Sequence, residues 1–150
     1  MKWIVTIAGA ASLAAQATAA GGATAEPQVV PIANPPARTI CIIENPEVRP
    51  EFLEAYRSDL LAKGLNVAVL KKPDRFYDCP MVTTYVAFWS KDVYTGFGSV
   101  IDYARLAVYR SGRPLGHIAF KRSSAYVMTK ADAQLQKLVD ELFPRPGETP

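Results

Sequence analysis

Apolar positions in the first half of the chain form two continuous runs of strand length. The first covers Arg38–Asn45 and stops at Pro46, and the second covers Leu65–Lys72 and stops at Pro73. The first run, rich in β-branched residues, indicates a strand with both sides covered, or at least a central one, and the second run predicts another strand.

The segment between these runs has helical spacing instead. Phe52, Tyr56 and Leu60 repeat every four residues, Pro50 precedes them at a suitable first helical position, and Gly64 follows as a stop signal. A strand, a helix and a strand joined by short turns favour a βαβ unit with parallel strands.

The second half predicts a hairpin, a further strand and a final helix. The hairpin strands cover residues 82–90 and 100–110, the next strand starts in LGHIAFKR, and SGRP between them is a turn signal. We therefore predict an α+β fold, a two-layer sandwich of order β-α-β-β-β-α with two helices on one face of a mixed sheet. The apolar face of the last helix contains Ala131, Leu135, Leu138, Val139 and Leu142.

The first nineteen residues have the pattern of a secretory signal peptide. Lys2 is followed by the apolar run Trp3–Leu13 and by an A-x-A cleavage sequence that ends at Ala19. Cleavage there leaves Ala20–Pro150, or 131 of the 150 residues. A retained membrane anchor is the alternative, but the run is shorter than the ~20 residues of a membrane span. We expect a protein of a bacterial periplasm or a secreted protein, with no integral membrane segment after processing.

Composition divides the rest of the chain into three parts. Residues 20–38 are rich in Gly, Ala and Pro and predict a flexible lead-in, residues 39–143 predict a single domain, and residues 144–150 predict a disordered tail. The formal net charge of +3, or +2 once Lys2 is removed, is too small to suggest nucleic acid as a partner.

Two cysteines remain after processing, Cys41 and Cys79, which are 38 positions apart. In an oxidising compartment an even pair in a small domain predicts one disulfide. The loop before Cys79 can return this residue to the first strand. Two separate buried thiols are the alternative.

Several of these segments together resemble a known architecture. TICIIENP, a helix ending in AKGL, NVAVL, a hairpin, GRPLGHIAFKR and LQKLVDELFP follow the pattern of small β-α-β-β-β-α domains of bacterial envelope proteins, such as the N-terminal domain of TolB. The resemblance spans most of residues 39–143 and rests on element order. It implies a role in envelope assembly or docking and transfers no functional residue to this chain.

His117 is the only histidine of the chain and therefore limits the possible chemistry. A Ser-His-Asp site would need it, with Asp102, Ser111 or Ser123 as conceivable partners, yet no G-x-S-x-G motif occurs. No spacing of His, Cys, Asp and Glu matches a metal site. We therefore predict no catalytic residue, no metal and no cofactor.

Strand parity separates two kinds of face in the second half of the chain. We assign the aliphatic and phenylalanine positions to the core under the helices, namely Val86, Phe88, Leu106, Val108, Ile118 and Phe120. Tyr, Trp and Arg dominate binding hot spots, so the opposite face becomes the predicted binding surface. It consists of Tyr85, Trp89, Tyr103, Arg105, Tyr109 and His117.

The sequence thus predicts a non-catalytic interaction or envelope-assembly module that docks an envelope protein or a second copy of itself. Three alternatives stay open: a small periplasmic hydrolase that uses His117, a protein that binds cell-wall glycan, and aromatic pairs that only stabilise the sheet. Residues 20–38 folding over the aromatic face would be a further way to cover it.

Overall fold

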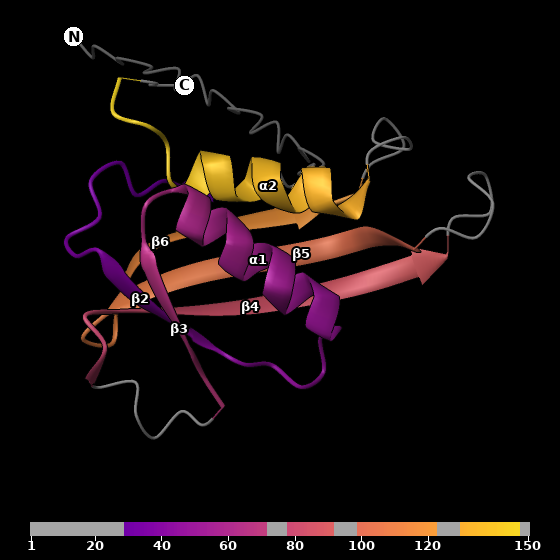
Figure 1. Cartoon of the computed structure of the whole chain (residues 1–150). Coiled ribbons are helices and arrows are strands. Elements are labelled where there is room, and N and C mark those ends of the chain that lie inside the picture. Colours follow the sequence, from indigo (N-terminus) through magenta and orange to yellow (C-terminus); the bar gives the residue numbers. More distant parts are fainter. Residues whose placement is uncertain (1–28, 72–77, 92–98, 123–129, 148–150) are drawn as a thin grey trace, which may run out of the picture.

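The computed structural model describes residues 29–71, 78–91, 99–122 and 130–147 of the chain. Two helices cover one face of a mixed six-stranded sheet (Figure 1). The α+β sandwich is confirmed. All five predicted strand segments are present, one more than the order β-α-β-β-β-α counts, and a short sixth strand precedes them. The helices are α1 (Pro50–Ala62) and α2 (Ala131–Leu142), and the strands are β1 (Val29–Val30), β2 (Thr39–Ile43), β3 (Asn66–Leu70), β4 (Met81–Lys91), β5 (Ser99–Arg110) and β6 (Arg113–Lys121).

The sheet has the strand order β1-β6-β5-β4-β2-β3. β2 pairs in parallel with both β3 and β4, and the other neighbouring strands pair antiparallel. The predicted βαβ unit is therefore present as β2-α1-β3. β2 lies between β4 and β3, and Ile40, Cys41 and Ile42 on its two faces are all buried, which agrees with its continuous apolar sequence.

The core lies between the sheet and the two helices. Ile40 and Ile42 of β2 and Tyr56 and Leu60 of α1 are fully buried there. The Tyr56 hydroxyl lies 2.7 Å from Oγ1 of Thr83, which donates to the carbonyl of Ala107 at 3.0 Å. These two polar side chains are thus satisfied inside the apolar layer. Burial also raises the pKa of Tyr56.

Part of the expected lead-in belongs to the domain. β1 pairs with β6, and Ile32 is 6% exposed and donates its N–H to the carbonyl of Leu142 at 2.7 Å. Gly116 permits this contact, because a Cβ there would lie 2.5 Å from both the Ile32 side chain and the Val30 carbonyl. This segment therefore packs along the β6 edge and the end of α2. The domain begins no later than Val29, ahead of the predicted start at residue 39.

The structure corrects the predicted faces of β4. Tyr85 is 2% exposed under the helices, whereas Val86 and Phe88, assigned to the core, are 36% and 61% exposed on the opposite face. Tyr85 lies across from Leu106, and facing residues of neighbouring strands share a side of the sheet. Since Leu106 is a core residue, its β4 partner must be one too. Leu106, Val108 and Ile118 are buried as predicted, and Phe120 is partly buried against the core.

Trp89 also lies on the helix side, because it alternates in phase with the buried Tyr85 and Ala87 along β4. The register of β4 and β5 shifts so that Phe88 faces Tyr103 while Trp89 faces the buried Ile101, leaving Asp102 as the extra residue. The indole meets the Phe52 ring edge-on at 6.2 Å, and the Arg49 guanidinium lies 4.8 Å from its centroid. Trp89 therefore packs at the start of α1, away from the predicted binding surface.

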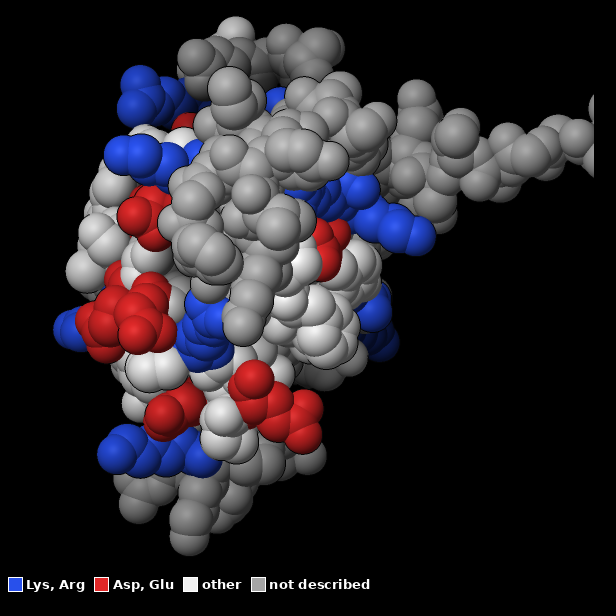
Figure 2. All heavy atoms as spheres, turned by 90° about the vertical axis from the view of Figure 1, so that its right-hand side faces the viewer, with Lys and Arg blue, Asp and Glu red and all other residues white. Residues whose placement is uncertain are grey.

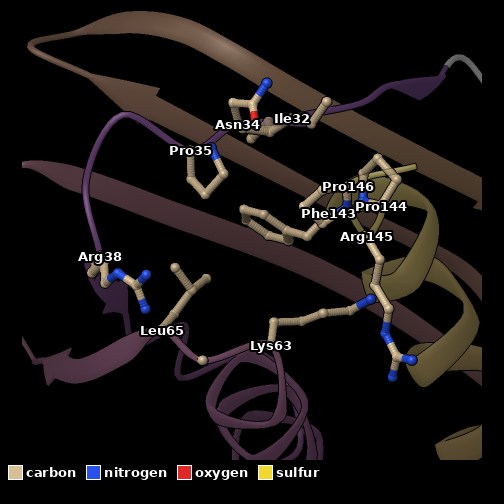
Figure 3. A pocket seen from close by; sticks show the side chains of 12 residues that line it. Ile32, Asn34, Pro35, Arg38, Lys63, Leu65, Phe143, Pro144, Arg145 and Pro146 are labelled. Carbon is tan, nitrogen blue, oxygen red and sulfur yellow. The ribbon is translucent and has the colours of Figure 1, made fainter. Parts of the chain in front are cut away.

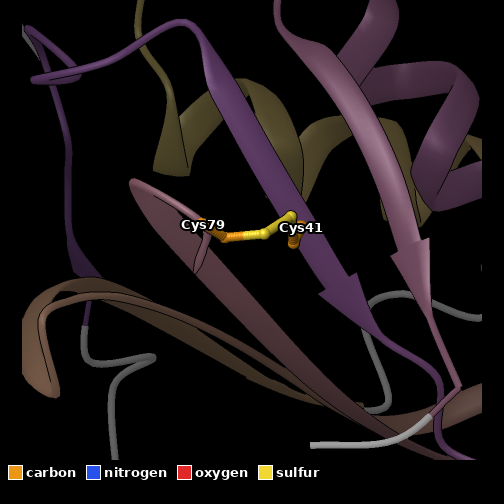
Figure 4. Close-up of a disulfide and its surroundings, with 2 residues drawn as sticks. All are labelled: Cys41 and Cys79. Carbon is orange, nitrogen blue, oxygen red and sulfur yellow. A yellow bond between two sulfur atoms is a disulfide. The ribbon is translucent and has the colours of Figure 1, made fainter. Parts of the chain in front are cut away.

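The disulfide between Cys41 and Cys79 is confirmed (Figure 4). The two Cα atoms are 6.1 Å apart, and Cys79 lies two residues before β4, the parallel neighbour of β2. The bridge thus fixes the start of β4 against β2, and it fits an extracytoplasmic location. Among the described residues, neither helix has the length and apolarity that crossing a membrane requires.

Candidate functional site: the outer face of the sheet

The sheet face opposite the helices, here called the outer face, carries the candidate site. Of the six predicted binding residues, Tyr103, Arg105 and Tyr109 of β5 and His117 of β6 lie on it. Residues that pair across neighbouring strands share a side of the sheet. The β5 residues Arg105, Ala107 and Tyr109 pair with Val86, Thr84 and Val82 of β4, and Ala107 also pairs with His117 of β6, so all of these residues lie on one face. Tyr85 and Trp89 lie on the helix side instead, and β4 contributes Val86 and Phe88 to the outer face.

The most exposed part of the outer face is an apolar patch near the β4–β5 hairpin, formed by Val86, Phe88 and Tyr103. The rings of Phe88 and Tyr103 are 5.9 Å apart at 33°, a cross-strand aromatic pair, and Val86 lies across from the exposed Arg105. Phe88 is the most exposed of the large apolar side chains among the described residues. We refer to Val86, Phe88, Tyr103 and Arg105 as the aromatic patch.

Pairing register is the signal that finds this patch from the sequence. Leu106 and Val108 are unambiguous core positions of β5, and a hairpin register that faces Tyr85 with Leu106 moves Phe88 to the outer face. The bulge at Asp102 has no comparable sequence signal.

A polar cluster follows the aromatic patch toward the hairpin end of the sheet. The bulge residue Asp102 accepts a hydrogen bond from the Ser90 hydroxyl at 2.8 Å, and Nη1 of Arg122 lies 3.3 Å from Ser90 and 3.5 Å from Asp102. The Asp102 carbonyl also accepts the Arg122 N–H at 2.7 Å. These bonds fix the bulge and join three strands at the patch border.

The structure does not bring the conceivable catalytic partners of His117 together. His117 faces Ala107, five positions along β5 from Asp102, which corresponds to about 16 Å of strand. The Asp102 carboxylate is engaged by Ser90 and Arg122, Ser111 lies in the β5–β6 turn, and Ser123 is outside the described residues. In the part of the chain that the structure describes, no three His, Cys, Asp or Glu residues form a group able to hold a metal.

A cavity of about 320 Å³ lies on the opposite side of the molecule from the outer face, between residues 32–38, the α1–β3 turn and the chain after α2 (Figure 3). Phe143 and Leu65 are buried in its wall, and Arg38, Lys63 and Arg145 are its basic lining residues. Lys63 is already paired with Asp140 of α2. The cavity therefore marks the seam where the first and last segments of the domain meet.

Charge is mixed on the face of the molecule that Figure 2 shows. Figure 2 shows basic and acidic side chains interspersed on the end of the molecule that lies at the right of Figure 1. No large field of one sign is visible in that view, which agrees with a formal net charge of +3 for the chain. Contacts of the aromatic patch are thus expected to depend on apolar area more than on long-range attraction.

Among the carboxylates that the structure describes, Asp59 of α1 has the most altered pKa. It borders an open groove of about 400 Å³ between α1 and α2. Burial and the nearby Asp140 and Asp132 raise its pKa to about 6, and Lys63 opposes them. Ionised Asp59 thus disfavours the packing of α2 against α1.

This arrangement predicts a pH-dependent stability. Because the folded pKa lies above the unfolded value, the contribution of Asp59 is largest below about pH 4 and is lost as the pH rises through about 6. Asp59→Asn should therefore gain about 1 kcal/mol of unfolding free energy over wild type at about pH 7.5 and almost nothing at about pH 4, the value being reduced because the side chain is partly exposed to solvent.

Urea unfolding of both proteins across this pH range measures the difference. Glu51→Gln, which removes an exposed carboxylate from the first turn of the same helix, serves as the control. An identical pH slope for wild type and Asp59→Asn would contradict the prediction.

Comparison with known proteins shows what this fold is similar to. Neither a protein family nor a curated protein sequence matches the chain. Among solved structures, the PelC dodecamer from Paraburkholderia phytofirmans has a TM-score of 0.56 and 11% identity, covering 78% of this chain and 95% of PelC. A single-substitution PelC dodecamer from the same organism gives 0.55 and 12% over the same shares. At such identities the similarity establishes a shared fold.

Proposed function

We propose that this protein is a non-catalytic assembly module of the cell envelope, acting outside the cytoplasm, and that copies of it associate through the aromatic patch. The observation that carries the proposal is the exposure of Phe88, 61%, beside Tyr103 on an otherwise ordered sheet. In a monomer this ring gains only its cross-strand contact with Tyr103, whereas a second copy would bury it.

The composition of the patch suits an interface. Aromatic rings bury a large area with few rotatable bonds, and Arg105 adds a cation at the border that can bond carbonyls or carboxylates of the partner surface. Strands β4, β5 and β6 hold these side chains on a rigid support. The patch is therefore presented in one geometry before binding, which lowers the entropic cost of association.

Location and assembly are supported by independent features. The expected signal peptide and the disulfide both fit an extracytoplasmic protein. The two similar solved structures are both PelC dodecamers, so this fold is compatible with assembly into many copies. The hydrolase alternative gains no support from the described residues, because Asp102 and Ser111 lie away from His117 along the sheet.

The patch makes a direct prediction. Replacing Phe88 and Tyr103 together by alanine should weaken self-association of the mature protein by about a hundredfold, since two buried aromatic anchors are removed from each copy. Sedimentation velocity over a concentration series measures the change. The control is Val30→Ala, which removes an apolar side chain that is 44% exposed on the edge strand β1, away from the aromatic patch on β4 and β5.

Three outcomes are informative. A loss of mass in the double variant, with wild-type mass in Val30→Ala, supports self-association through the patch. An unchanged mass in the double variant overturns it. A wild-type protein that stays monomeric but captures an envelope protein in a patch-dependent manner would replace the second copy by that partner.

A further inference from the structure

The sheet ends at β3, and this edge is built for pairing. β3 is the last strand in the order β1-β6-β5-β4-β2-β3, and no described segment pairs with its far side (Figure 1). Its sequence NVAVL contains neither a charge nor a proline. Natural sheets normally protect an edge with charged residues, prolines or bulges, so an uncharged and regular edge strand is a template for another strand.

The hydrogen bonds of β3 show which backbone groups are available. The Asn66 N–H donates to the Arg38 carbonyl at 2.7 Å, and the Leu70 carbonyl accepts the Glu44 N–H at 2.9 Å. Backbone groups alternate sides along a strand, so Asn66, Ala68 and Leu70 face β2. The N–H and C=O groups of Val67 and Val69 therefore point away from the sheet.

Apolar side chains are exposed along the same edge. Val69 is 36% exposed, and Leu61 of α1 is 48% exposed. Lys63 contacts Asp140 of α2, so this position at the end of α1 faces α2. Positions two apart on a helix do not share a face, and Leu61 therefore lies on the side of α1 that points away from α2. Both side chains thus lie where an added strand would bury part of their area.

The geometry points to an antiparallel pairing of β3 with β3 of a second copy, around a two-fold axis at Ala68. In this register Val67 of each copy faces Val69 of the other, and each of these pairs exchanges two backbone hydrogen bonds. Ala68 faces its own copy in the closer, non-hydrogen-bonded pair, where a small side chain fits best. The flanking residues also suit the register, because Asn66 faces Leu70 and Lys71 faces Leu65.

A second copy is the occupant that this strand itself specifies. The pairing needs only one surface, used by both partners, as in most symmetric dimers. It closes at two copies, so larger assemblies need another contact, and the proposed aromatic patch supplies one on a different face of the sheet. The pairing of β3 stands without that patch and depends on it only for growth beyond a dimer.

The test isolates the edge by removing the patch first. In a protein carrying Phe88→Ala and Tyr103→Ala, β3 pairing predicts a dimer by light scattering after size-exclusion chromatography. Adding Val69→Pro, which removes an outward N–H that has no role in the β2–β3 ladder, should halve the molar mass. Val69→Thr keeps the N–H and the β-branched shape and should leave the dimer intact.

The register has its own readout. Mixing Val67→Cys with Val69→Cys protein should give a disulfide-linked dimer under mild oxidation, because facing Cα atoms lie about 5.5 Å apart, within the range of a disulfide. Either variant alone should link much less, since like residues are offset diagonally across the two-fold axis.

Each failure is distinct from failure of the patch proposal. Equal masses for the Val69→Pro and Val69→Thr proteins, with circular dichroism showing both folded, would overturn β3 pairing. A patch variant that is already monomeric would overturn it as well. If instead the patch variant keeps the wild-type mass and only Val69→Pro lowers it, β3 pairing stands and the patch proposal falls.

Discussion

Replacing Tyr85 by alanine should lower the free energy of unfolding by about 3–5 kcal/mol, whereas the same change at Phe88 should cost about 1 kcal/mol or less. Tyr85 is 2% exposed, its ring stacks on Phe52 at 5.5 Å, and its hydroxyl accepts the Asn45 N–H at 3.1 Å. Alanine would leave a cavity and an unpaired donor there. Phe88 is mostly in solvent, so its removal leaves no cavity.

Urea unfolding of each variant as a monomer, at low protein concentration, provides the comparison. Tyr85→Phe is an intermediate control that keeps the ring and removes only the hydroxyl, and it should cost about 1–2 kcal/mol. Similar losses for Tyr85→Ala and Phe88→Ala would contradict the observed faces of β4. A larger loss of unfolding free energy for Phe88→Ala than for Tyr85→Ala would support the assignment from side-chain type alone, with Phe88 in the core and Tyr85 on the opposite face.

The elements themselves were predictable because their signals are local. The proline and glycine at the ends of α1, the apolar spacing of α2 and the runs of β2 and β3 each depend on a few neighbouring residues. The βαβ unit followed from the short turns around α1. The disulfide was predictable because a domain expected outside the cytoplasm has two cysteines, and two cysteines allow only one pairing.

The faces of β4 were not local in this sense. Both faces carry large apolar or aromatic side chains, so residue type did not distinguish Tyr85 from Phe88. The decision came from β5, whose core residue Leu106 faces Tyr85, and Trp89 then follows Tyr85 by alternation along β4. A strand with two apolar faces has to be assigned together with its neighbours.

The same argument explains the segment before β2. Val29 and Ile32 stand in a stretch without periodicity, and their role depends on the unpaired edge of β6 and on the space that Gly116 leaves. Neither feature is visible before the sheet is assembled. The sheet thus ends in the two-residue strand β1 on one side and in the five-residue strand β3 on the other, so β3 is the longer of its two edges.

The second large effect is expected from the disulfide. Replacing Cys41 and Cys79 together by alanine should lower the free energy of unfolding by about 3–4 kcal/mol, because the bridge closes a loop of 38 residues and restricts the unfolded chain. Alanine is preferred to serine because Cys41 is 2% exposed, and a buried hydroxyl would add a cost of its own.

Reduction provides the matched control for this variant. Urea unfolding with and without a thiol reductant should shift the wild-type midpoint toward that of the double variant, while the midpoint of the variant stays fixed. The bridge also fixes the first residues of β4 beside β2, and β4 carries Phe88 on its other half. Self-association should therefore survive reduction wherever the fold does, since the aromatic patch depends on the β4–β5 pairing and not on the bridge. A wild-type midpoint that does not respond to the reductant, with the thiols shown to be free, would contradict a stabilising role for the disulfide.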